Sequence, residues 1–295
     1  MERHPLRHDT CGIIVLYRPD VSLLLKNIAG ISRQVDRLYL VDNTEDARPY
    51  APALQSMEGV SYLALQRNTG IAHALNEGCR AARAAGFRWA VTLDQDSVVP
   101  EEYIDACARF LDAGDRRKTG IVGISWTARD YAETRPAEQV FRVITSGSLT
   151  SLAAWEAVGG FREELFIDCV DTEFCLNLLR NDYEVWQLPY LRLEHRLGND
   201  TSEIRIAGRH LCYATHHHAT RCYYIARNNL LVGRQYRNLF PRHAKLLRKE
   251  VRNLAVRILL FEKGKRTKLA AVWQGIRDYR RRIAGPINDK TPLLS

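Results

Sequence analysis

Short apolar runs alternate with longer segments of helical periodicity through the first half of the chain. The apolar runs match the length of buried strands, and the longer segments place apolar side chains at intervals of three and four residues. The predicted strands are residues 11–16, 37–41, 60–65, 89–93, 121–125, 140–145 and 185–188. This alternation is typical of strand–helix units, and it predicts an α/β fold with a mixed, mainly parallel sheet flanked by helices.

Local signals mark where the predicted helices begin and end. Asp20 or Ser22 can cap a helix that continues to Ile31, and Gly86 follows an alanine-rich helical segment at residues 68–85. Residues 166–182 become helical in their later part, and the chain from about residue 210 onwards is predicted to be mostly helical.

The C-terminal region has an amphipathic pattern. Apolar residues recur at helical spacing, and Lys and Arg fill the positions between them. The apolar positions are Leu247, Val251, Leu254, Ile258 and Phe261, followed by Leu269, Val272, Ile276, Tyr279 and Ile283. Two interpretations stay open: a pair of surface helices packed on the domain, or a peripheral contact of residues 241–284 with anionic lipid. No nucleic-acid partner is expected, because no binding motif accompanies the charge.

Charge is concentrated in the same region. The formal net charge is +9, but residues 241–295 hold 15 Lys and Arg against 4 Asp and Glu, so the first 240 residues hold 28 against 30. The basic balance therefore concerns what the C-terminal region contacts and says little about chemistry upstream.

Composition limits the class of protein. A chain of 295 residues with 46% hydrophobic residues can bury a sizeable core. No apolar stretch approaches the roughly 18 residues that a membrane span needs, and the polar N-terminus lacks the apolar segment of a secretory signal. The 7 cysteines include no CxxC pair, which argues against a disulfide framework or a cysteine-based zinc site. A cytoplasmic protein is expected.

Two carboxylates, Asp94 and Asp96, directly follow the predicted strand at residues 89–93. Ligands of α/β sheets bind at the carboxyl ends of strands, and two carboxylates two residues apart can face one hard cation there. Such a cation can bridge the protein to a diphosphate. The tripeptide alone is a weak pattern, and its position after an apolar strand gives it weight.

A second acidic cluster contains Asp168, Asp171 and Glu173 at the start of a predicted helix. Acidic residues there can simply cap the helix, or one carboxylate can remove a proton from an acceptor hydroxyl. His195 can serve as a further metal ligand or as an ordinary polar residue. The run at residues 216–218 lacks spaced partners, which favours a polar loop or an acceptor contact over a metal tract.

Taken in order, these motifs resemble the family 2 glycosyltransferases with the GT-A fold, most closely the bacterial rhamnosyltransferase-like members. The resemblance covers roughly residues 10–230. The motifs are residues 13–17 (IIVLY), 41–43 (VDN), 68–72 (NTGIA) with Asn76 and Gly78, 93–97 (LDQDS), 145–148 (TSGS), 160–162 (GFR), 166–168 (FID), 171–173 (DTE), His195, and 223–228 (YYIARN).

The resemblance implies a role for each matching residue. The donor site would comprise Leu16, Tyr17, Arg18, Asp42, Arg67, Asn68, Gly70, Asp94 and Gln95. Asp94 and Asp96 would hold Mg²⁺ or Mn²⁺, and His195 would assist. Asp171 would be the catalytic base, with Asp168 as the nearest substitute; many relatives have two adjacent acids where this chain has Val170 and Asp171.

The implied activity is an inverting transfer of L-rhamnose from dTDP-L-rhamnose to a glycan or lipid-linked glycan acceptor in cell-surface polysaccharide (O-antigen) synthesis. Residues 1–210 would form the catalytic domain, with a donor half at about 10–100 and an acceptor half at about 101–210. Residues 211–295 would form a helical, basic region at the inner face of the cell membrane.

Three alternatives are weighed. A related transferase could use UDP-galactofuranose or another sugar nucleotide, and a non-catalytic module could bind the nucleotide sugar or a membrane. A nucleotidyltransferase is disfavoured, because residues 11–20 lack a glycine-rich, lysine-bearing phosphate loop.

Overall fold

The computed structural model describes residues 4–47, 49–127, 130–195, 202–206, 209–214 and 217–287. The chain divides into two compact units. The first comprises Met1–Arg162 with Asp171–His195, and the second comprises Glu163–Val170 with Arg196–Ser295. A short internal segment therefore belongs to the C-terminal unit, although both of its flanks in sequence belong to the first.

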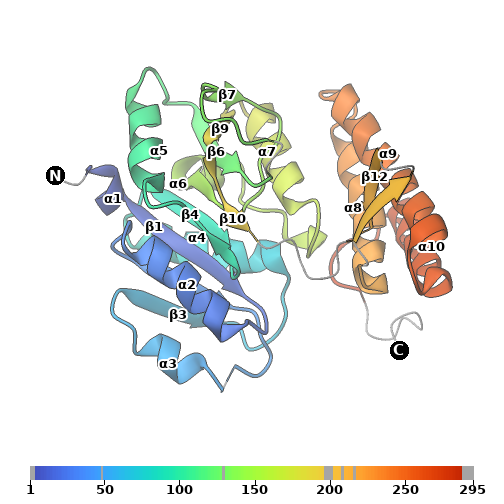
Figure 1. Cartoon of the computed structure of the whole chain (residues 1–295), viewed down its shortest axis with the longest axis horizontal. Coiled ribbons are helices and arrows are strands. Elements are labelled where there is room, and N and C mark those ends of the chain that lie inside the picture. Colours follow the sequence, from blue (N-terminus) through green and yellow to red (C-terminus); the bar gives the residue numbers. More distant parts are fainter. Residues whose placement is uncertain are drawn as a thin grey trace. The chain divides into compact units, whose positions relative to one another are not determined.

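An eight-stranded sheet forms the centre of the first unit, in the order β3-β2-β1-β4-β8-β6-β9-β7 (Figure 1). The strands are β1 (Thr10–Leu16), β2 (Leu38–Asp42), β3 (Val60–Ala64), β4 (Trp89–Asp94), β6 (Thr119–Ser125), β7 (Glu138–Gln139), β8 (Ser148–Ser151) and β9 (Glu184–Arg192). Strands β3, β2, β1 and β4 run parallel, whereas β8 and β7 are antiparallel to their neighbours. The predicted mixed, mainly parallel sheet is confirmed.

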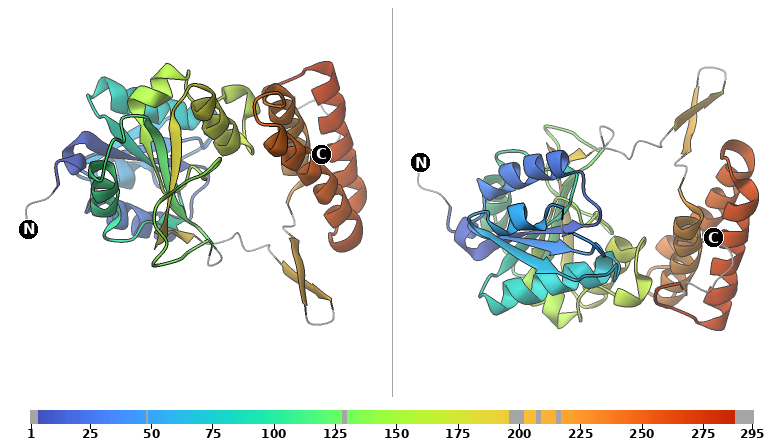
Figure 2. Two further views of the ribbon diagram at one scale, coloured as in Figure 1. Left: turned by 90° about the horizontal axis from the view of Figure 1, so that it is seen from above. Right: turned by 90° about the horizontal axis from the view of Figure 1, so that it is seen from below.

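Helices cover both faces of this sheet (Figure 2). They are α1 (Leu6–Asp9), α2 (Val21–Ser32), α3 (Ala51–Gln55), α4 (Ile71–Ala84), α5 (Tyr103–Asp112), α6 (Leu152–Ala157) and α7 (Val170–Arg180), the last beginning one residue before the first unit resumes. Asp20 caps α2 as predicted, accepting hydrogen bonds from the amides of Ser22 and Leu23. A small separate ladder joins β5 (Ser97–Val98) to β10 (Glu194–His195).

Alternate residues of each strand face opposite layers, as the period of two along a strand requires. Ile14 and Leu16 of β1 belong to one buried cluster with Leu24, Ile28 and Ile31 of α2. On the other face, α4 lies so close that a side chain at Gly78 would meet Ile13 at 2.5 Å and Val41 at 3.2 Å. Glycine at this position therefore sets the distance between α4 and the sheet.

One local prediction is wrong, and a second fails only at its start. Residues 140–145 form no strand: Phe141 is 49% exposed, and Val143 is buried against Gly123, where an added Cβ would lie 2.5 Å from its side chain. The amide of Val140 still donates to the carbonyl oxygen of Val185 in β9 at 2.9 Å, but the rest of the apolar run packs over a neighbouring strand without continuing the ladder. The prediction of a mostly helical chain from about residue 210 onwards is confirmed by the helices within residues 219–281, but where that region begins, β12 (Arg209–Ala214) forms an antiparallel pair with β11 (Ser202–Ile206).

The second unit contains the helices α8 (Ala219–Gln235), α9 (Pro241–Phe261) and α10 (Lys265–Arg281), and the 3-10 turn η1 (Glu163–Leu165). Cys222, Ala226, Val251, Leu254, Ile258 and Val272 form the core between the helices. A side chain at Gly275 of α10 would lie 2.5 Å from the carbonyl oxygen of Tyr223, so glycine permits α10 to pack closely on α8. None of the helices that the structure describes is long and apolar enough to span a lipid bilayer.

Candidate functional site

The parallel strands end in register and bring the predicted donor-site residues to one edge of the sheet. Leu16 at the end of β1 pairs with Asp42 at the end of β2, and Asp42 pairs with Ala64 of β3. On the other side of β1, Val15 pairs with Asp94 at the end of β4. This edge is where an open α/β sheet binds its ligands.

Three hydrogen-bonding side chains fix the acidic turn that follows β4. The amide of Asn27 in α2 donates to the carbonyl oxygen of Asp94 at 2.7 Å, and the amide nitrogen of Asp94 donates to the hydroxyl of Ser146 at 3.0 Å. The side chain of Gln95 accepts from the amide nitrogen of Tyr17 at 2.8 Å and donates to its carbonyl oxygen at 3.2 Å. Gln95 therefore joins the acidic turn to the loop after β1.

Asp94 and Asp96 are both partly buried at this turn. In the described part of the chain, no group of three or more His, Cys, Asp or Glu side chains is arranged to hold a metal ion. Two carboxylates nevertheless fit Mg²⁺ or Mn²⁺, because such ions commonly take one or two protein carboxylates and complete their shell with phosphate oxygens and water. The backbone of His195 pairs with Ser97, the residue after Asp96, in the ladder of β10 and β5.

Asp42 is only 1% exposed, and its carboxylate is held by neighbouring donors. It accepts hydrogen bonds from the amide of Thr44 at 2.9 Å and from the hydroxyl of Tyr62. Burial raises the pKa of Tyr62, and the bond to Asp42 raises it further. Burial likewise raises the pKa of Tyr50 to about 12, and its hydroxyl donates to Thr44 at 2.9 Å. A pocket of about 600 Å³ opens beside Asp42 and Tyr62, between β3 and α3.

The residues after β1 reach solvent. Tyr17 is 39% exposed, and the guanidinium of Arg18 lies 5.2 Å from the centre of its ring. Arg18 has a positive φ of 47°, its amide donates to the Thr44 hydroxyl at 2.9 Å, and its side chain pairs with Glu45 at 3.2 Å. Leu16, by contrast, is fully buried and shapes the site only through its backbone.

A second amide-based network orders the loop before α4. Asn43 accepts from the amide of Thr69 at 2.7 Å and donates to Asn68 at 3.2 Å. Asn68 in turn accepts from the amide of Gly70. Gly70, with a φ of 87°, is the N-cap residue directly before α4. Arg67 precedes this network and is exposed. The loop and the acidic turn thus lie at the same carboxyl edge of the sheet.

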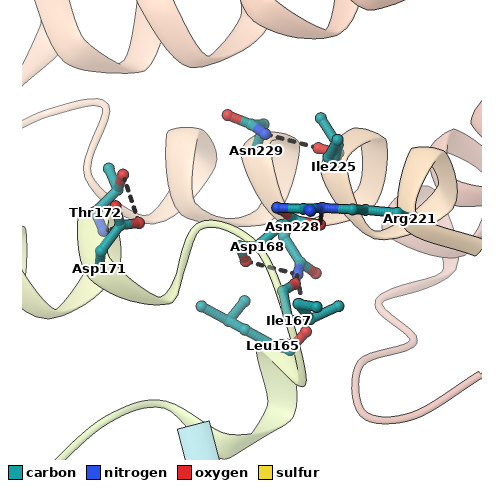
Figure 3. Close-up of polar contacts among 9 residues, drawn as sticks. All are labelled: Leu165, Ile167, Asp168, Asp171, Thr172, Arg221, Ile225, Asn228 and Asn229. Atoms are coloured by element: carbon teal, nitrogen blue, oxygen red, sulfur yellow. Dashed lines mark hydrogen bonds and ion pairs between the residues drawn. The ribbon is translucent and has the colours of Figure 1, made fainter. Parts of the chain in front are cut away.

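The two candidate bases have different partners (Figure 3). Asp171 lies in the first turn of α7 and accepts from the amide of Thr172 at 2.7 Å and from its hydroxyl at 3.3 Å. Asp168 belongs to the second unit, where both of its carboxylate oxygens accept from the guanidinium of Arg221 at 3.0–3.2 Å.

Asn27 is a site residue that the sequence prediction missed. It lies on the buried face of α2 with Leu24, Ile28 and Ile31, and it is 1% exposed. The sequence did contain a signal: Asn27 lies at helical spacing among apolar residues. Its amide could have been predicted to be buried and to bind a nearby polar group, because a buried amide needs a hydrogen-bonding partner.

His216 of the histidine run lies outside the described residues. His217 precedes α8 and is partly buried. Burial lowers its pKa from 6.5 to about 4, and the nearby positive charges of Arg221, Arg257 and Lys268 lower it further. His217 is therefore neutral at pH 7.

The mixed, mainly parallel sheet with helices on both faces has the architecture of the GT-A fold. The chain matches the model of glycosyl transferase family 2 over residues 13–161, just over half of its length, and it belongs to that family.

The dTDP-rhamnosyl transferase RfbF of Shigella flexneri is 29% identical over 241 residues, which cover 76% of this chain and 79% of that protein. Two solved structures are similar in fold. S. aureus TarS 1–349 in complex with UDP-GlcNAc has a TM-score of 0.59 and 13% identity, covering 93% of this chain and 81% of that one. GalNAc-T7 with UDP, GalNAc and Mn²⁺ has a TM-score of 0.53 and 12% identity, covering 63% of this chain and 43% of that one. The chain thus spans less than half of the GalNAc-T7 chain.

Acidification is expected to destabilise the protein through His217. Its pKa is about 4 when folded against 6.5 ordinarily, so the unfolded chain binds more protons between these values and the free energy of unfolding rises with pH. Stability present above about pH 6.5 is lost as the pH falls towards 4. Denaturant unfolding from pH 7 to pH 4 should show a shallower decline for His217→Gln than for wild type. His218→Gln, at the exposed neighbour, should follow wild type; equal slopes for all three proteins would contradict the prediction.

Proposed function

We propose that the chain transfers L-rhamnose, with inversion at the anomeric carbon, from dTDP-L-rhamnose to a glycan or lipid-linked glycan acceptor in cell-surface polysaccharide synthesis, such as that of O-antigen. The observation that carries this proposal is the Asp94–Asp96 turn, held at the carboxyl end of β4 by Asn27, Ser146 and Gln95. The likeness to the Shigella flexneri rhamnosyl transferase supports the choice of sugar. UDP-galactofuranose or another sugar nucleotide is the alternative donor.

The donor would lie along the carboxyl edge of the sheet. Its nucleoside would contact the exposed Tyr17 and Arg18 and the pocket beside Asp42. Arg67, exposed before the ordered loop at residues 68–70, would face its phosphates. Residues 1–210 would thus carry the transfer reaction.

Asp94 and Asp96 would hold Mg²⁺ or Mn²⁺, and His195 would assist from β10. The cation, when bound, supplies Lewis-acid stabilisation of the departing nucleoside diphosphate. Because Asn27 and Ser146 bind the backbone of Asp94, they keep the turn in place without using its carboxylate.

Asp171 would accept the proton of the attacking acceptor hydroxyl. Asp168 is a weaker candidate, because a carboxylate bound by both arms of a guanidinium has to leave that partner before it can take a proton. Asp168 would instead help to order the segment that precedes α7.

The C-terminal region would bind the inner face of the membrane, where a lipid-linked acceptor resides. The hairpin tip, which we define as residues 256–266, joins α9 to α10. Val256, Leu259 and Leu260 are 47%, 52% and 61% exposed there. Their spacing places all three on one side of the last turns of α9.

Exposed basic residues surround this apolar surface. Lys263, Lys265 and Arg266 are exposed, whereas Glu262, the single acid among residues 251–277, has a fully buried side chain that pairs with Lys268 at 2.6 Å. An apolar surface edged by Lys and Arg is suited to the interface of an anionic membrane.

Turnover of a panel of nucleotide sugars with Mg²⁺ or Mn²⁺ tests the reaction. We expect metal-dependent turnover of dTDP-L-rhamnose, reduced by about 100-fold or more in Asp96→Ala because charge on the leaving group is no longer stabilised. Glu101→Ala, at an exposed acid after the turn, is the control and should match wild type. Preferred turnover of another donor would overturn the sugar assignment, and donor binding without turnover, with acceptor lipid supplied, would favour the non-catalytic alternative.

The base assignment is tested by exchanging each candidate carboxylate for its amide. Asp171→Asn should lower kcat by about 10²–10⁴-fold, the usual contribution of a general base, with little change in donor KM. Asp168→Asn should lower kcat by less than about 10-fold, since the amide keeps the shape of the side chain and the substitution weakens its pairing with Arg221 without removing the proposed base. The reverse order of the two variants, measured in the same transfer assay, would assign the base to Asp168.

Sedimentation with vesicles of phosphatidylglycerol and phosphatidylcholine tests the membrane contact. Replacing Leu259 and Leu260 by Gln should abolish most binding, and salt should weaken the binding of wild type because part of the attraction is electrostatic. Leu239→Gln, at an equally exposed leucine outside α9 and α10, is the control. Full sedimentation of the double variant would show that the helices serve only as packing.

A further inference from the structure

Residues 163–170 form a connecting segment whose conformation has to be imposed by its surroundings. Phe166, Asp168 and Cys169 have φ values of 66°, 62° and 65°. Residues other than glycine rarely adopt this left-handed backbone conformation. Three such residues within a stretch of four persist only where neighbouring groups hold them. The segment belongs to the second unit and leads directly into Asp171.

Asn228 of α8 makes several of the hydrogen bonds that fix the backbone of this segment. Its side-chain amide nitrogen donates to three carbonyl oxygens of the segment: Leu165 at 2.8 Å, Ile167 at 2.7 Å and Asp168 at 3.1 Å (Figure 3). Its amide oxygen accepts from Nε of Arg227 at 2.9 Å, which fixes which end of the amide faces the segment. Asn228 is fully buried, so water cannot replace these bonds.

Arg227 binds the beginning of the same segment. It is fully buried, and its guanidinium donates to the carbonyl oxygens of Glu164 at 3.1 Å, Leu165 at 3.4 Å and Gly285 at 2.5 Å. The amide of Gly285 also donates to the carbonyl oxygen of Glu164 at 2.7 Å. One buried cation thus ties the segment to the chain that follows α10.

Two further contacts from α8 reach side chains of the segment. The ring of Phe166 stacks on Tyr224 with centres 5.1 Å apart and planes inclined by 18°. Arg221 pairs with the carboxylate of Asp168. Contacts from Arg221, Tyr224, Arg227 and Asn228 of α8 therefore reach the segment from Glu164 to Asp168.

We infer that Arg227 and Asn228 are positioning residues for the transfer reaction: by fixing residues 163–170, they set the place and direction of Asp171 at the start of α7. This inference rests on the proposed role of Asp171 as the base. A general base acts only within hydrogen-bonding reach of the hydroxyl, so displacement by about 1 Å costs about 10²-fold in rate.

Asn229 provides a matched control within the same helix. It is also buried, at 8% exposure, and its amide donates to the carbonyl oxygen of Ile225 at 2.8 Å, inside α8. Truncating Asn229 therefore removes a buried amide from α8 without touching the segment (Figure 3).

Steady-state kinetics of Asn228→Ala, Asn229→Ala and Asp171→Asn, each in the full chain, test the inference. For Asn228→Ala we expect kcat lower by about 10–100-fold with donor KM within about twofold, because the donor edge is unchanged. Amide hydrogen exchange in residues 164–169 should accelerate in this variant alone. Asn229→Ala should keep kcat within about twofold of wild type. Asn228→Ser, which retains one donor, should be intermediate and serves if the alanine variant does not fold.

Each other outcome has a distinct meaning. Asn228→Ala with faster exchange but unchanged kcat would overturn the inference while leaving the proposed base intact, provided that Asp171→Asn is inactive. An equal loss in Asn228→Ala and Asn229→Ala would show a general structural role and would also overturn it. Activity retained by Asp171→Asn would overturn the base assignment, and the inference with it.

Discussion

The loops of this protein depend on buried side-chain amides that bind backbone groups. A loop at the end of a strand leaves N–H and C=O groups without partners from the sheet, and each buried group needs one. Asn27 satisfies the carbonyl of Asp94, and Asn76 binds both the amide and the carbonyl of Phe161 at 2.8 Å. Asn228 does the same for the segment before α7. An amide suits this task because it offers both donors and an acceptor and carries no charge that would be costly to bury.

Much of the fold could be predicted because apolar periodicity records which faces are buried. The first four strands and α2 lie where the pattern places them, and the carboxyl ends of parallel strands necessarily share an edge. The position of the acidic turn on that edge therefore followed from the strand that precedes it. The strand predicted at residues 140–145 failed because an apolar run records burial alone, and Val143 is buried by packing over Gly123.

Tertiary partners are what the sequence could not supply. Asp168 and Asp171 are three residues apart and carry the same local signal, an acid near the start of a helix. Arg221, more than fifty residues later, distinguishes them by binding Asp168. Likewise, Arg227 and Asn228 belonged to a recognisable motif, but the hydrophobic periodicity of the sequence does not show that they contact residues 164–168, about sixty positions earlier in the chain.

The side chains that fix the acidic turn are uncharged, and this affects how the turn can bind a cation. Asn27, Ser146 and Gln95 are neutral, and they reach the backbone of Asp94 and Tyr17 instead of a carboxylate. A Lys or Arg in their place would fix the turn equally well but would compete with a cation for the same oxygens. Neutral amides and hydroxyls can therefore order an acidic turn in advance without lowering its attraction for a divalent ion. In the proposed reaction, a turn ordered in this way would help to stabilise the departing diphosphate, because groups arranged beforehand need no reorganisation during the reaction.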